Sequence, residues 1–486
     1  MWALHRAPCR VNCNGCRKPC IVFFRATCLY PVKEEHVPVI SPRLFKAYDI
    51  RAQTSLLTPE AAQFIGLGIG AEAHQRGVKQ IALARDGRFS SPALAQALID
   101  ALLASGINVL DLGLAATPLL YFAARNYAAG SGVMITGSHN PADYNGIKIT
   151  LAGETIDGEA LLALRQRIEA DDFVRGQGEH TMLHIADAYY AAVMAACPIA
   201  KRFKVVVDCG NGVPGAFAPD LYRALGCEVL ELYCKVDGAF PNHHPDPQVE
   251  ANLADLKRVV QEQQADIGLA FDGDGDRLGV VTRHGESIPG DRLLMLFAAA
   301  LLEKQPGHIL YDVKSSGLIS DWVSRKGGTC TAIPTGHGHM KRHMYASKAL
   351  LAGELSGHFA FKDWPDDDAL FAGARFLSMI AGRDLDQMLA ALPQSVSTPE
   401  LQVALEQDGH GLVADIAKNA VFPRALRIFT IDGLRIEYAD GFGLIRASNT
   451  TPVLTLRMEA KTALGLARIQ QELAAAIAPL VLPCCE

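Results

Sequence analysis

Two features of this chain could do chemistry together: a serine in a tight polar loop and, far downstream, a run of three aspartates. The serine, Ser138, lies in segment 136–141 (TGSHNP), directly after the apolar run 133–135. This pattern places its hydroxyl in a turn at the end of a buried strand, where α/β sheets bind ligands. If the aspartates hold a metal ion beside the serine, a phosphate on its oxygen could pass to a substrate hydroxyl. The pair therefore predicts phosphoryl transfer.

The aspartate run is segment 272–276 (DGDGD), and it follows the largely apolar stretch 265–271, which is typical of a buried strand. Its alternating glycines let the backbone bend so that three carboxylates surround one hard cation. A calcium EF-hand is disfavoured, because its glycine and glutamate positions hold Arg277 and Arg283. Three carboxylates and a phosphate oxygen suit Mg²⁺. A purely structural cation or a solvated acidic turn is the alternative.

The neighbours of Ser138 add an amine and argue against a hydrolase. A serine and a histidine that are adjacent in sequence do not form a catalytic dyad, and no GxSxG elbow surrounds the serine. The dipeptide Asn145-Gly146 predicts a turn that delivers Lys148 to the same loop. Lys148 could take or give the proton of the reacting hydroxyl if its pKa is lowered. Taken alone, Ser138 could be a helix cap and Lys148 a solvated surface charge.

Further polar loops could bind a substrate. Segment 353–358 (GELSGH) follows the apolar run 349–352, and its glutamate and serine could hydrogen-bond vicinal hydroxyls of a polyol. Segment 335–337 (TGH) offers a histidine that could serve as acid or base. Segment 446–452 (RASNTTP) combines an arginine with hydroxyl and amide donors, which suits a dianionic phosphate, and Arg457 could add charge. Each loop could instead be a helix cap or ordinary solvated surface.

Length and composition limit the number of domains and the class of protein. At 486 residues the chain exceeds what one hydrophobic core usually supports, so we expect three or four domains. Hydrophobic residues at 49%, charged residues at 20% and a net charge of −6 fit a soluble globular protein without a nucleic-acid or membrane partner. No apolar stretch reaches the roughly 20 residues that span a bilayer. Scattered cysteines favour a reducing cytoplasm over a disulfide scaffold.

Residues 1–38 differ from the rest of the chain. They contain basic residues and several cysteines without clear periodicity, so we expect a disordered leader or an artefactual upstream start. A metal or iron–sulfur site is the less favoured alternative. The cysteines concerned are Cys9, Cys13, Cys16, Cys20 and Cys28.

One pattern occurs three times along the body: a short apolar strand, a polar loop, a helix, a glycine and a second strand. Three such units predict three related α/β domains with mostly parallel sheets. The last part of the chain is richer in short strands and ends in a helical stretch, which predicts a smaller α+β domain. We place these four domains at residues 39–183, 184–285, 286–395 and 396–486.

Taken together, these loops resemble those of the α-D-phosphohexomutase superfamily, and most of all its bacterial phosphomannomutase/phosphoglucomutase group. The resemblance extends over about residues 43–480, with the motifs in the family's order. It implies an α/β fold of three related mixed α/β domains plus a smaller C-terminal α+β domain around a central cleft. It also implies Mg²⁺ as cofactor and phosphoserine at Ser138, primed by a hexose 1,6-bisphosphate. The activity it implies is interconversion of hexose 1-phosphate and hexose 6-phosphate, of mannose, glucose or both.

The resemblance also implies roles for individual residues. Catalytic roles fall to Ser138, Lys148, Arg51, His139 and His337. The ligands of Mg²⁺ would be Ser138, Asp272, Asp274 and Asp276. Substrate sugar phosphates would be bound by Tyr48, Arg277, Lys314, Glu354, Ser356, His358, Arg446, Ser448, Asn449 and Thr450.

The chain departs from the family pattern at two places. Ala52 stands where the family usually has glycine after Arg51, which we expect to stiffen a turn, and segment 362–368 is shorter than usual at the expected cleft rim. Three rival functions stay open: a phosphoglucosamine mutase, a catalytically inactive sugar-phosphate binding protein and a phosphatase. Leu355 in the sugar loop favours the mannose/glucose branch by resemblance. We expect a monomer, because one chain completes the cleft.

Overall fold

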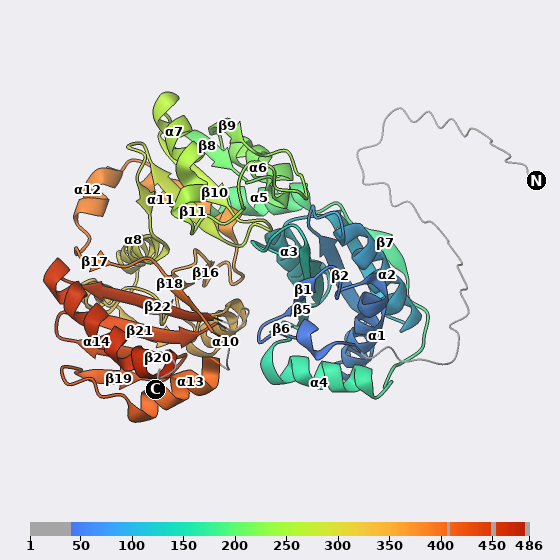
Figure 1. Ribbon diagram of the computed structural model, residues 1–486. Coiled ribbons are helices and arrows are strands. Elements are labelled where there is room, and N and C mark those ends of the chain that lie inside the picture. Colours follow the sequence, from blue (N-terminus) through green and yellow to red (C-terminus); the bar gives the residue numbers. More distant parts are fainter. Residues whose placement is uncertain (1–39, 406–408, 449–452, 482–486) are drawn as a thin grey trace, which may run out of the picture. The chain divides into compact units, whose positions relative to one another are not determined.

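The computed structural model describes residues 40–405, 409–448 and 453–481 (Figure 1). The predicted leader and its cysteines lie outside the described residues. Within the described part, three mixed α/β sheets are followed by an antiparallel sheet, which confirms the predicted fold class. None of the helices in these ranges combines the length and the apolar character needed to cross a lipid bilayer.

The first sheet has the strand order β1-β5-β4-β2-β3-β7, with β6 added to β5. Strands β4, β2, β3 and β7 run parallel, whereas β5 is antiparallel to both β4 and β1. The strands are β1 (Ile50–Gln53), β2 (Gln80–Arg85), β3 (Asn108–Leu114), β4 (Gly132–Ile135), β5 (Tyr144–Leu151), β6 (Glu154–Thr155) and β7 (His180–Met182). The helices around it are α1 (Pro59–Gln75), α2 (Ser91–Ala104), α3 (Thr117–Tyr127) and α4 (Gly158–Glu169), after a short 3₁₀ helix at Pro42–Leu44.

Alternation along β2 assigns the helices to the two faces of this sheet. Ile81 and Leu83 belong to a buried cluster shared with α1, α2 and α4, whereas Ala82 and Ala84 belong to another shared with α3. Because successive side chains of a strand point to opposite faces, α3 covers the face opposite the other three helices. The sheet is therefore buried on both faces, as its continuous apolar strands predict.

The second and third sheets repeat this architecture with fewer strands, in the orders β12-β11-β10-β8-β9 and β14-β13-β15-β16. Strands of the second sheet are β8 (Lys204–Asp208), β9 (Glu228–Leu232), β10 (Ile267–Phe271), β11 (Leu278–Thr282) and β12 (Ser287–Ile288). Those of the third are β13 (His308–Asp312), β14 (Thr329–Ile333), β15 (Leu351–Gly353) and β16 (Phe359–Phe361). Their helices are α5 (Ala186–Ala196), α6 (Ala218–Ala224), α7 (Ala254–Glu262), α8 (Gly290–Leu302), α9 (Leu318–Arg325), α10 (His337–Ser347), α11 (Ala369–Ile380) and α12 (Leu385–Ala390), with 3₁₀ helices at Val213–Ala216 and Glu250–Leu253.

One connection is common to the three sheets. In each, a parallel strand leads through a short polar loop into an antiparallel neighbour: β4 into β5, β10 into β11 and β15 into β16. The three loops are segments 136–143, 272–277 and 354–358. They contain the serine, the aspartate run and the expected sugar-binding residues. Each chemical loop is thus held at both ends by a pair of hydrogen-bonded strands.

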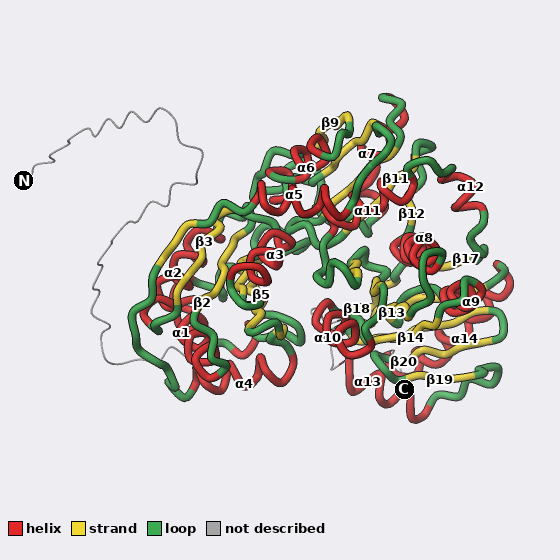
Figure 2. The backbone as a smooth tube through the Cα atoms, turned by 180° about the vertical axis from the view of Figure 1, so that it is seen from behind, coloured by secondary structure: helices red, strands yellow, loops and turns green. Residues whose placement is uncertain are grey.

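The fourth sheet is antiparallel, in the order β17-β22-β21-β20-β19, with β18 on β22. Helices α13 and α14 pack against β21, and α14 also packs against β22 (Figure 1). Figure 2 shows both helices from behind, together with strands β19 and β20. The strands are β17 (Val396–Ser397), β18 (Leu401–Ala404), β19 (Arg427–Phe429), β20 (Leu434–Tyr438), β21 (Gly441–Ala447) and β22 (Val453–Ala460), and the helices are α13 (Gly409–Asn419) and α14 (Ala463–Val481).

A continuous apolar core joins the first three sheets. One cluster of buried side chains contains residues of β2, β8, β10 and β13 together with α3, α5, α8 and α11. At its centre, Asp368 begins α11 by accepting the Phe371 N–H at 2.8 Å, the Trp364 indole N–H and the Tyr189 hydroxyl. Burial raises the pKa of Asp368 to about 6, although these donors favour its charged form.

Removing the Tyr189 hydroxyl should test this buried carboxylate. Tyr189 donates to both oxygens of Asp368, at 2.9 and 2.8 Å. We expect Tyr189→Phe to lower the free energy of unfolding by about 1.5 to 3 kcal/mol at about pH 8, the usual range for a hydrogen bond to a charged group. The loss should shrink near pH 5, because the carboxyl group is then neutral and accepts a weaker bond.

Thermal unfolding at both pH values provides the measurement, with Tyr190→Phe as the control. The Tyr190 hydroxyl donates to the neutral carbonyl oxygen of Phe217 at 3.0 Å. Its loss should cost about 0.5 to 1.5 kcal/mol with no such pH dependence. Equal losses for the two variants at every pH would contradict the charged-acceptor account.

Candidate active site

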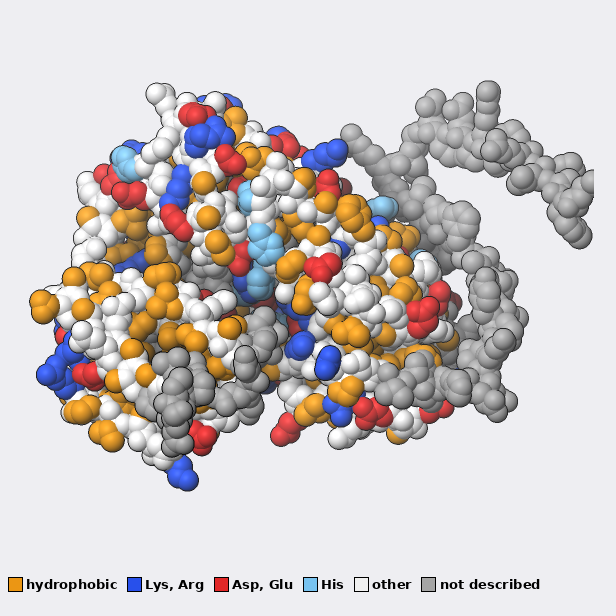
Figure 3. Space-filling model, viewed as in Figure 1, with side chains coloured by type: hydrophobic (Ala, Val, Ile, Leu, Met, Phe, Trp, Pro, Cys, Tyr) orange, Lys and Arg blue, Asp and Glu red, His pale blue; other side chains and the backbone are white. Residues whose placement is uncertain are grey.

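The serine loop, the aspartate loop and the predicted sugar-binding loop (354–358) meet within the described structure. The Ser138 hydroxyl contacts Asp272, and the Leu278 N–H that follows the aspartate loop donates to the Gly357 carbonyl oxygen at 3.0 Å. Figure 3 shows histidine, acidic and basic side chains gathered in a hollow in the middle of the view. The sequence-predicted groups from three separate sheets therefore form one polar site.

Ser138 is held in an unusual backbone conformation. Its φ is +49°, in the left-handed region that residues other than glycine rarely adopt. Its N–H donates to the Thr136 hydroxyl at 2.8 Å, and its own hydroxyl donates to Asp272 Oδ2 at 2.7 Å. His139 Nδ1 lies 3.2 Å from the same hydroxyl oxygen. The turn aims the serine oxygen at the carboxylates instead of leaving it as a helix cap.

The aspartate loop is organised by its first carboxylate. Oδ1 of Asp272 accepts the backbone N–H groups of Gly275, Asp276 and Arg277 at 3.0 to 3.1 Å. Burial and the neighbouring aspartates nevertheless raise the pKa of Asp272 well above its ordinary value. Gly275 has a φ of +83°, which explains a glycine at this bend.

The second aspartate, Asp274, is fixed by the first sheet's helix α3. The Thr117 hydroxyl donates to Asp274 Oδ2 at 2.6 Å, and the Thr117 N–H donates to the Asp274 carbonyl oxygen at 2.9 Å. Thr117 is the first residue of α3. The sequence prediction missed this residue, because nothing in its own surroundings signals a metal loop.

Lys148 lies between two of the carboxylates. Its Nζ is 2.7 Å from Asp274 Oδ2 and 2.6 Å from Asp276 Oδ2. Burial alone would lower the pKa of Lys148, but the two aspartates outweigh burial and raise it well above its ordinary value. The predicted condition for acid–base action, a lowered pKa, is therefore wrong for this structure. The ammonium group is held charged as a partner of the acidic loop.

The acidic loop fits a divalent cation. Asp272, Asp274 and Asp276 are almost fully buried, and ligand oxygens from all three lie within 4.8 Å of one another. Among the described residues, Asp274 Oδ1 has no hydrogen-bond partner. Three converging carboxylates and such an unsatisfied oxygen are what a hard cation such as Mg²⁺ requires. The Ser138 oxygen, bonded to Asp272, stands where it could join them.

The predicted sugar-binding loop contains a buried network of three side chains. The Ser356 hydroxyl lies 2.8 Å from both Glu354 Oε2 and His358 Nδ1. His358 Nε2 lies 3.3 Å from Asp276 Oδ1, which links this loop to the acidic loop. Burial alone would lower the pKa of His358, but Asp276 and Glu354 raise it to about 10. Glu354 is correspondingly anionic, with a pKa of about 2.

Two other predicted histidines are neutral. Both ring nitrogens of His337 are shielded from solvent and have no hydrogen-bond partner among the described residues. Burial lowers the pKa of His337 to about 4 and that of His139 well below its ordinary value. Both imidazoles are therefore unprotonated at neutral pH.

The predicted cations of the first two sheets border the serine loop. Arg51 donates to Asn140 Oδ1 at 2.6 Å and pairs with Asp49. Arg277 lies 3.9 Å from Asp246. Ala52 lies inside strand β1 opposite Asn145, so the expectation that it stiffens a turn is wrong.

The predicted phosphate loop connects β21 to β22, and only part of it is described. Arg446 donates to Asp432 Oδ2 at 2.8 Å and to the Tyr48 hydroxyl at 3.2 Å, which joins the first and fourth sheets. Ser448 is half-buried beside it, whereas Asn449 and Thr450 lie outside the described residues.

Lys314 and Arg457 pair with different carboxylates. Lys314 lies 3.2 Å from Glu400 and has a raised pKa, because Glu400 and Asp312 outweigh its burial. Arg457, expected to add charge for phosphate, instead pairs with the buried Asp291 at 2.9 Å and donates to the Lys314 carbonyl oxygen. That expectation was wrong: Arg457 connects the fourth sheet to the third.

Segment 362–368, expected to be shorter than usual in the family, has a defined structure. Trp364 stacks on Phe371, with ring centroids 4.3 Å apart, and Asp367 lies 2.9 Å from the Lys341 ammonium. Lys341 in turn lies 3.4 Å from the Tyr121 ring centroid. The segment thus links α10 to α3, a contact that was not predicted because its partners are far apart along the chain.

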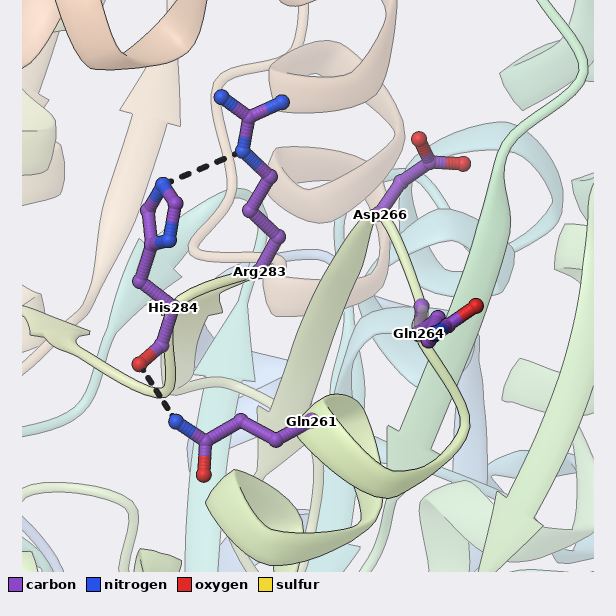
Figure 4. A pocket seen from close by; sticks show the side chains of 6 residues that line it. Gln261, Gln264, Asp266, Arg283 and His284 are labelled. Atoms are coloured by element: carbon purple, nitrogen blue, oxygen red, sulfur yellow. Dashed lines mark hydrogen bonds between the residues drawn. The ribbon is translucent and has the colours of Figure 1, made fainter.

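A separate cavity of about 410 Å³ does not belong to the site (Figure 4). Its residues precede β10 or follow β11, at the opposite ends of these strands from the aspartate loop. They also bond one another: Gln261 donates to the His284 carbonyl oxygen at 2.7 Å, and Arg283 Nε donates to His284 Nε2 at 3.2 Å. The cavity therefore lies at the end of β10 and β11 that is remote from the serine and aspartate loops.

Replacing Lys148 should strengthen divalent cation binding. Its ammonium group occupies the space between two carboxylates, so it competes with any cation there. We expect Lys148→Met to lower the Mg²⁺ dissociation constant roughly tenfold, as follows from removing one unit charge a few Å away. Isothermal titration calorimetry without substrate measures this directly.

Two further variants control this measurement. Lys314→Met removes another buried, carboxylate-paired lysine outside the acidic loop and should leave Mg²⁺ affinity unchanged. Asp274→Asn should weaken binding, because it removes the charge of a proposed ligand. Unchanged or weaker binding in Lys148→Met would argue against the carboxylates as the cation site.

Comparison with known proteins agrees with this geometry. Successive parts of the chain match phosphoglucomutase/phosphomannomutase alpha/beta/alpha domains I, II and III, at residues 42–175, 187–285 and 289–396. Residues 400–476 match the C-terminal domain of the same family. The four matches follow the order of the four sheets along the chain, and only the short strands β7 and β12 lie wholly between matched ranges.

Individual relatives are similar over nearly their whole length. A phosphoglucomutase of Neisseria gonorrhoeae is 49% identical over 90% of this chain and 97% of its own. A phosphomannomutase/phosphoglucomutase of Pseudomonas aeruginosa is 46% identical over 89% of this chain and 95% of its own. The crystal structure of a phosphoglucomutase/phosphomannomutase family protein from Burkholderia thailandensis, 44% identical, has a TM-score of 0.86 over 91% of this chain and 98% of its own. The chain belongs to the phosphoglucomutase/phosphomannomutase family.

Proposed function

We propose that the protein interconverts hexose 1-phosphate and hexose 6-phosphate, acting as a phosphomannomutase/phosphoglucomutase through a phosphoserine at Ser138. One observation carries the proposal: the Ser138 hydroxyl oxygen, on a strained turn, lies 2.7 Å from a carboxylate of a buried triple-aspartate loop. A solvated turn or a helix cap would need neither the strain nor the buried acids. The names of the closely related proteins support the same activity.

In the proposed first step, the bond between Ser138 Oγ and phosphorus breaks while a bond forms from phosphorus to the free hydroxyl oxygen of the sugar. The electron pair of the broken bond stays on Ser138 Oγ, which takes up one proton to restore the serine hydroxyl and so balances the proton that the sugar loses. The sugar hydroxyl loses its proton to a neutral imidazole, for which His337 is our candidate because its ring nitrogens are unpaired. The Lys148 ammonium balances negative charge beside the transferred group. A bound Mg²⁺, held by the three aspartates and the serine oxygen, would neutralise phosphate charge during transfer.

The product of this step is a hexose 1,6-bisphosphate, which must turn end for end and return its other phosphate to Ser138. The two ends of the sugar therefore need separate phosphate sites. We assign the non-reacting phosphate to Arg446 and Ser448 with Asn449 and Thr450, and assign Tyr48, Arg277 and Lys314 to the substrate. The Arg446 contact with Tyr48 supports a clamp that spans the first and fourth sheets.

Glu354 and Ser356 are our candidates for orienting the sugar ring, with His358 completing their network. Charged and hydroxyl groups of this kind can hydrogen-bond two neighbouring hydroxyls of a sugar ring. They can bind the bisphosphate before and after it turns only if both orientations present a similar pair of hydroxyls to them. The anionic Glu354 and cationic His358 support this role, because hydrogen bonds to charged groups are stronger than neutral ones.

Mannose and glucose phosphates are the proposed substrates. The relatives with these names are 45 to 49% identical to the chain, whereas a probable phosphoglucosamine mutase of Pyrococcus abyssi is 34% identical. We further propose that the protein acts as a monomer, since residues from one chain complete the described site. A reducing cytoplasm is the proposed location, on the basis of five free cysteines in the described body.

Replacing the proposed phosphate acceptor should end turnover. We expect Ser138→Ala to abolish mutase activity and phosphate incorporation, with an unchanged circular dichroism spectrum and intact Mg²⁺ binding. Mass spectrometry after incubation with glucose 1,6-bisphosphate measures the incorporation. Ser105→Ala serves as a control, because the Ser105 hydroxyl is equally buried but donates to the Ala101 carbonyl oxygen in a helix. Mutase activity of Ser138→Ala at the wild-type rate would refute the mechanism.

A substrate panel should separate the rival functions. We expect turnover of mannose 1-phosphate and glucose 1-phosphate to exceed that of glucosamine 1-phosphate, with little free phosphate released. Coupled assays of each product and a colorimetric phosphate assay provide the measurements. Fastest turnover of glucosamine 1-phosphate would favour the phosphoglucosamine mutase, phosphate release at the rate of mutase turnover would favour a phosphatase, and binding without turnover would favour an inactive binding protein.

A further inference from the structure

We propose that Arg88 is the residue that positions Ser138 for phosphate transfer. Arg88 follows strand β2, in the segment RDGR at 85–88, and it has no assigned role in the proposed function, on which this inference rests. Its side chain is 0% exposed to solvent. A fully buried guanidinium beside the serine loop needs a physical explanation.

The Arg88 guanidinium supplies the hydrogen-bond donors that the serine loop lacks. Its Nη2 donates to the carbonyl oxygens of Ser138 at 2.7 Å and Asn140 at 2.6 Å. Its Nη1 donates to the carbonyl oxygens of Pro141 and Tyr144, the latter at 2.9 Å. Four carbonyl groups of one turn therefore converge on a single side chain. Without it, these inward-facing carbonyls would need other buried donors.

Asp86 fixes the guanidinium and the loop at the same time. Asp86 Oδ2 lies 3.1 Å from Arg88 Nε and accepts the Gly137 N–H at 3.2 Å. The other oxygen, Oδ1, accepts the Arg88 N–H at 3.0 Å and the Ser91 hydroxyl. Asp86 accepts the N–H of Gly137, and Arg88 donates to the carbonyl oxygen of Ser138. The pair therefore fixes the backbone on both sides of the serine.

The close packing of the serine loop on Arg88 explains why residue 137 is a glycine. A Cβ atom added at Gly137 would lie 2.5 Å from Cζ and 2.6 Å from Nε of Arg88, closer than real Cβ atoms approach other atoms. Gly137 has no positive φ that would itself require glycine. The Phe240 ring, whose centroid lies 5.0 Å from Cζ, adds a cation–π contact.

These contacts act on the orientation of the reacting oxygen. Ser138 stays at a φ of +49° only if its surroundings hold it there. Rotation of this residue would move its Oγ away from Asp272, and a misplacement of about 1 Å can cost 10²-fold in rate. Arginine is specifically suited, because its planar fork reaches several acceptors in one plane, whereas lysine offers one ammonium group.

The central test is Arg88→Lys in the full chain. It keeps the charge beside Asp86 but cannot serve the four carbonyls. We expect kcat with glucose 1-phosphate to fall roughly 10- to 100-fold, while KM changes less than about threefold, because the proposed sugar and phosphate contacts lie on other loops. The control is Arg292→Lys on helix α8, since Arg292 also donates to the Pro393 carbonyl oxygen and to the Ser395 hydroxyl, in the segment between α12 and β17. Its kcat should be unchanged.

A second variant keeps the arginine and disturbs the same contact from the loop side. Gly137→Ala adds the methyl group that would meet the guanidinium, so it should lower kcat by a comparable factor. This variant decides the question if Arg88→Lys fails to fold. Wild-type kcat in either folded variant, or an equal loss of kcat in Arg292→Lys, would overturn the proposal.

Amide hydrogen exchange tests the same proposal without any mutase assay. In Arg88→Lys, peptides covering residues 136–146 should exchange faster than in the wild type, while peptides of the second, third and fourth sheets should not change. Uniformly faster exchange, or no change in this segment, would overturn a positioning role. If the wild type proves to have no mutase activity, the proposed function fails, yet the exchange experiment still decides whether Arg88 orders the loop.

Discussion

The repulsion among three buried carboxylates is the constraint on which this structure depends. The three aspartates are 0 to 1% exposed: Asp272, Asp274 and Asp276. Negative charges so near one another in a low-dielectric interior cost free energy unless each is compensated. The compensating groups come from elsewhere in the fold: Lys148 from the first sheet and His358 from the third. The compensation of the aspartate loop therefore depends on side chains of the first and third sheets. The same burial would favour the proposed cation, because an ion bound there would meet three carboxylates with little competing water.

The sequence predicts those features of this arrangement that depend on residues close together along the chain. The apolar runs 133–135 and 265–271 predicted strands β4 (Gly132–Ile135) and β10 (Ile267–Phe271) within a few residues, because apolar runs bounded by turn residues are local signals. The serine and aspartate loops were found for the same reason: glycines, polar residues and a preceding apolar strand are all adjacent in sequence. The pairing of β1 with β5 was not predicted, since strand partners far apart along the chain leave no mark in either segment.

The errors in the predicted site share one cause, which is that a side chain's partner decides its role. Lys148 was assigned a conditional acid–base role, but its position between Asp274 and Asp276 raises its pKa. Arg457 was expected to add charge beside the predicted phosphate loop, yet it pairs with Asp291 on helix α8. Arg88 was given no role, although it has four carbonyl acceptors in the serine turn. Residue type and local pattern do not contain these long-range partners.

The equivalence of the three loops explains how one architecture serves three kinds of chemistry. In each sheet a parallel strand ends in a polar loop and an antiparallel strand returns beside it, so the loop is fixed at both ends while its side chains are free to differ. The carboxyl ends of such strands face a common crevice. A hydroxyl on the first loop, carboxylates on the second and a Glu–Ser–His network on the third can then converge without any loop carrying more than one function. The fourth sheet contributes its arginine from a hairpin of purely antiparallel strands, and the contact of Arg446 with Tyr48 joins this hairpin to the sheet that carries the serine. A phosphate held at that hairpin would therefore bind both the first and the fourth sheets.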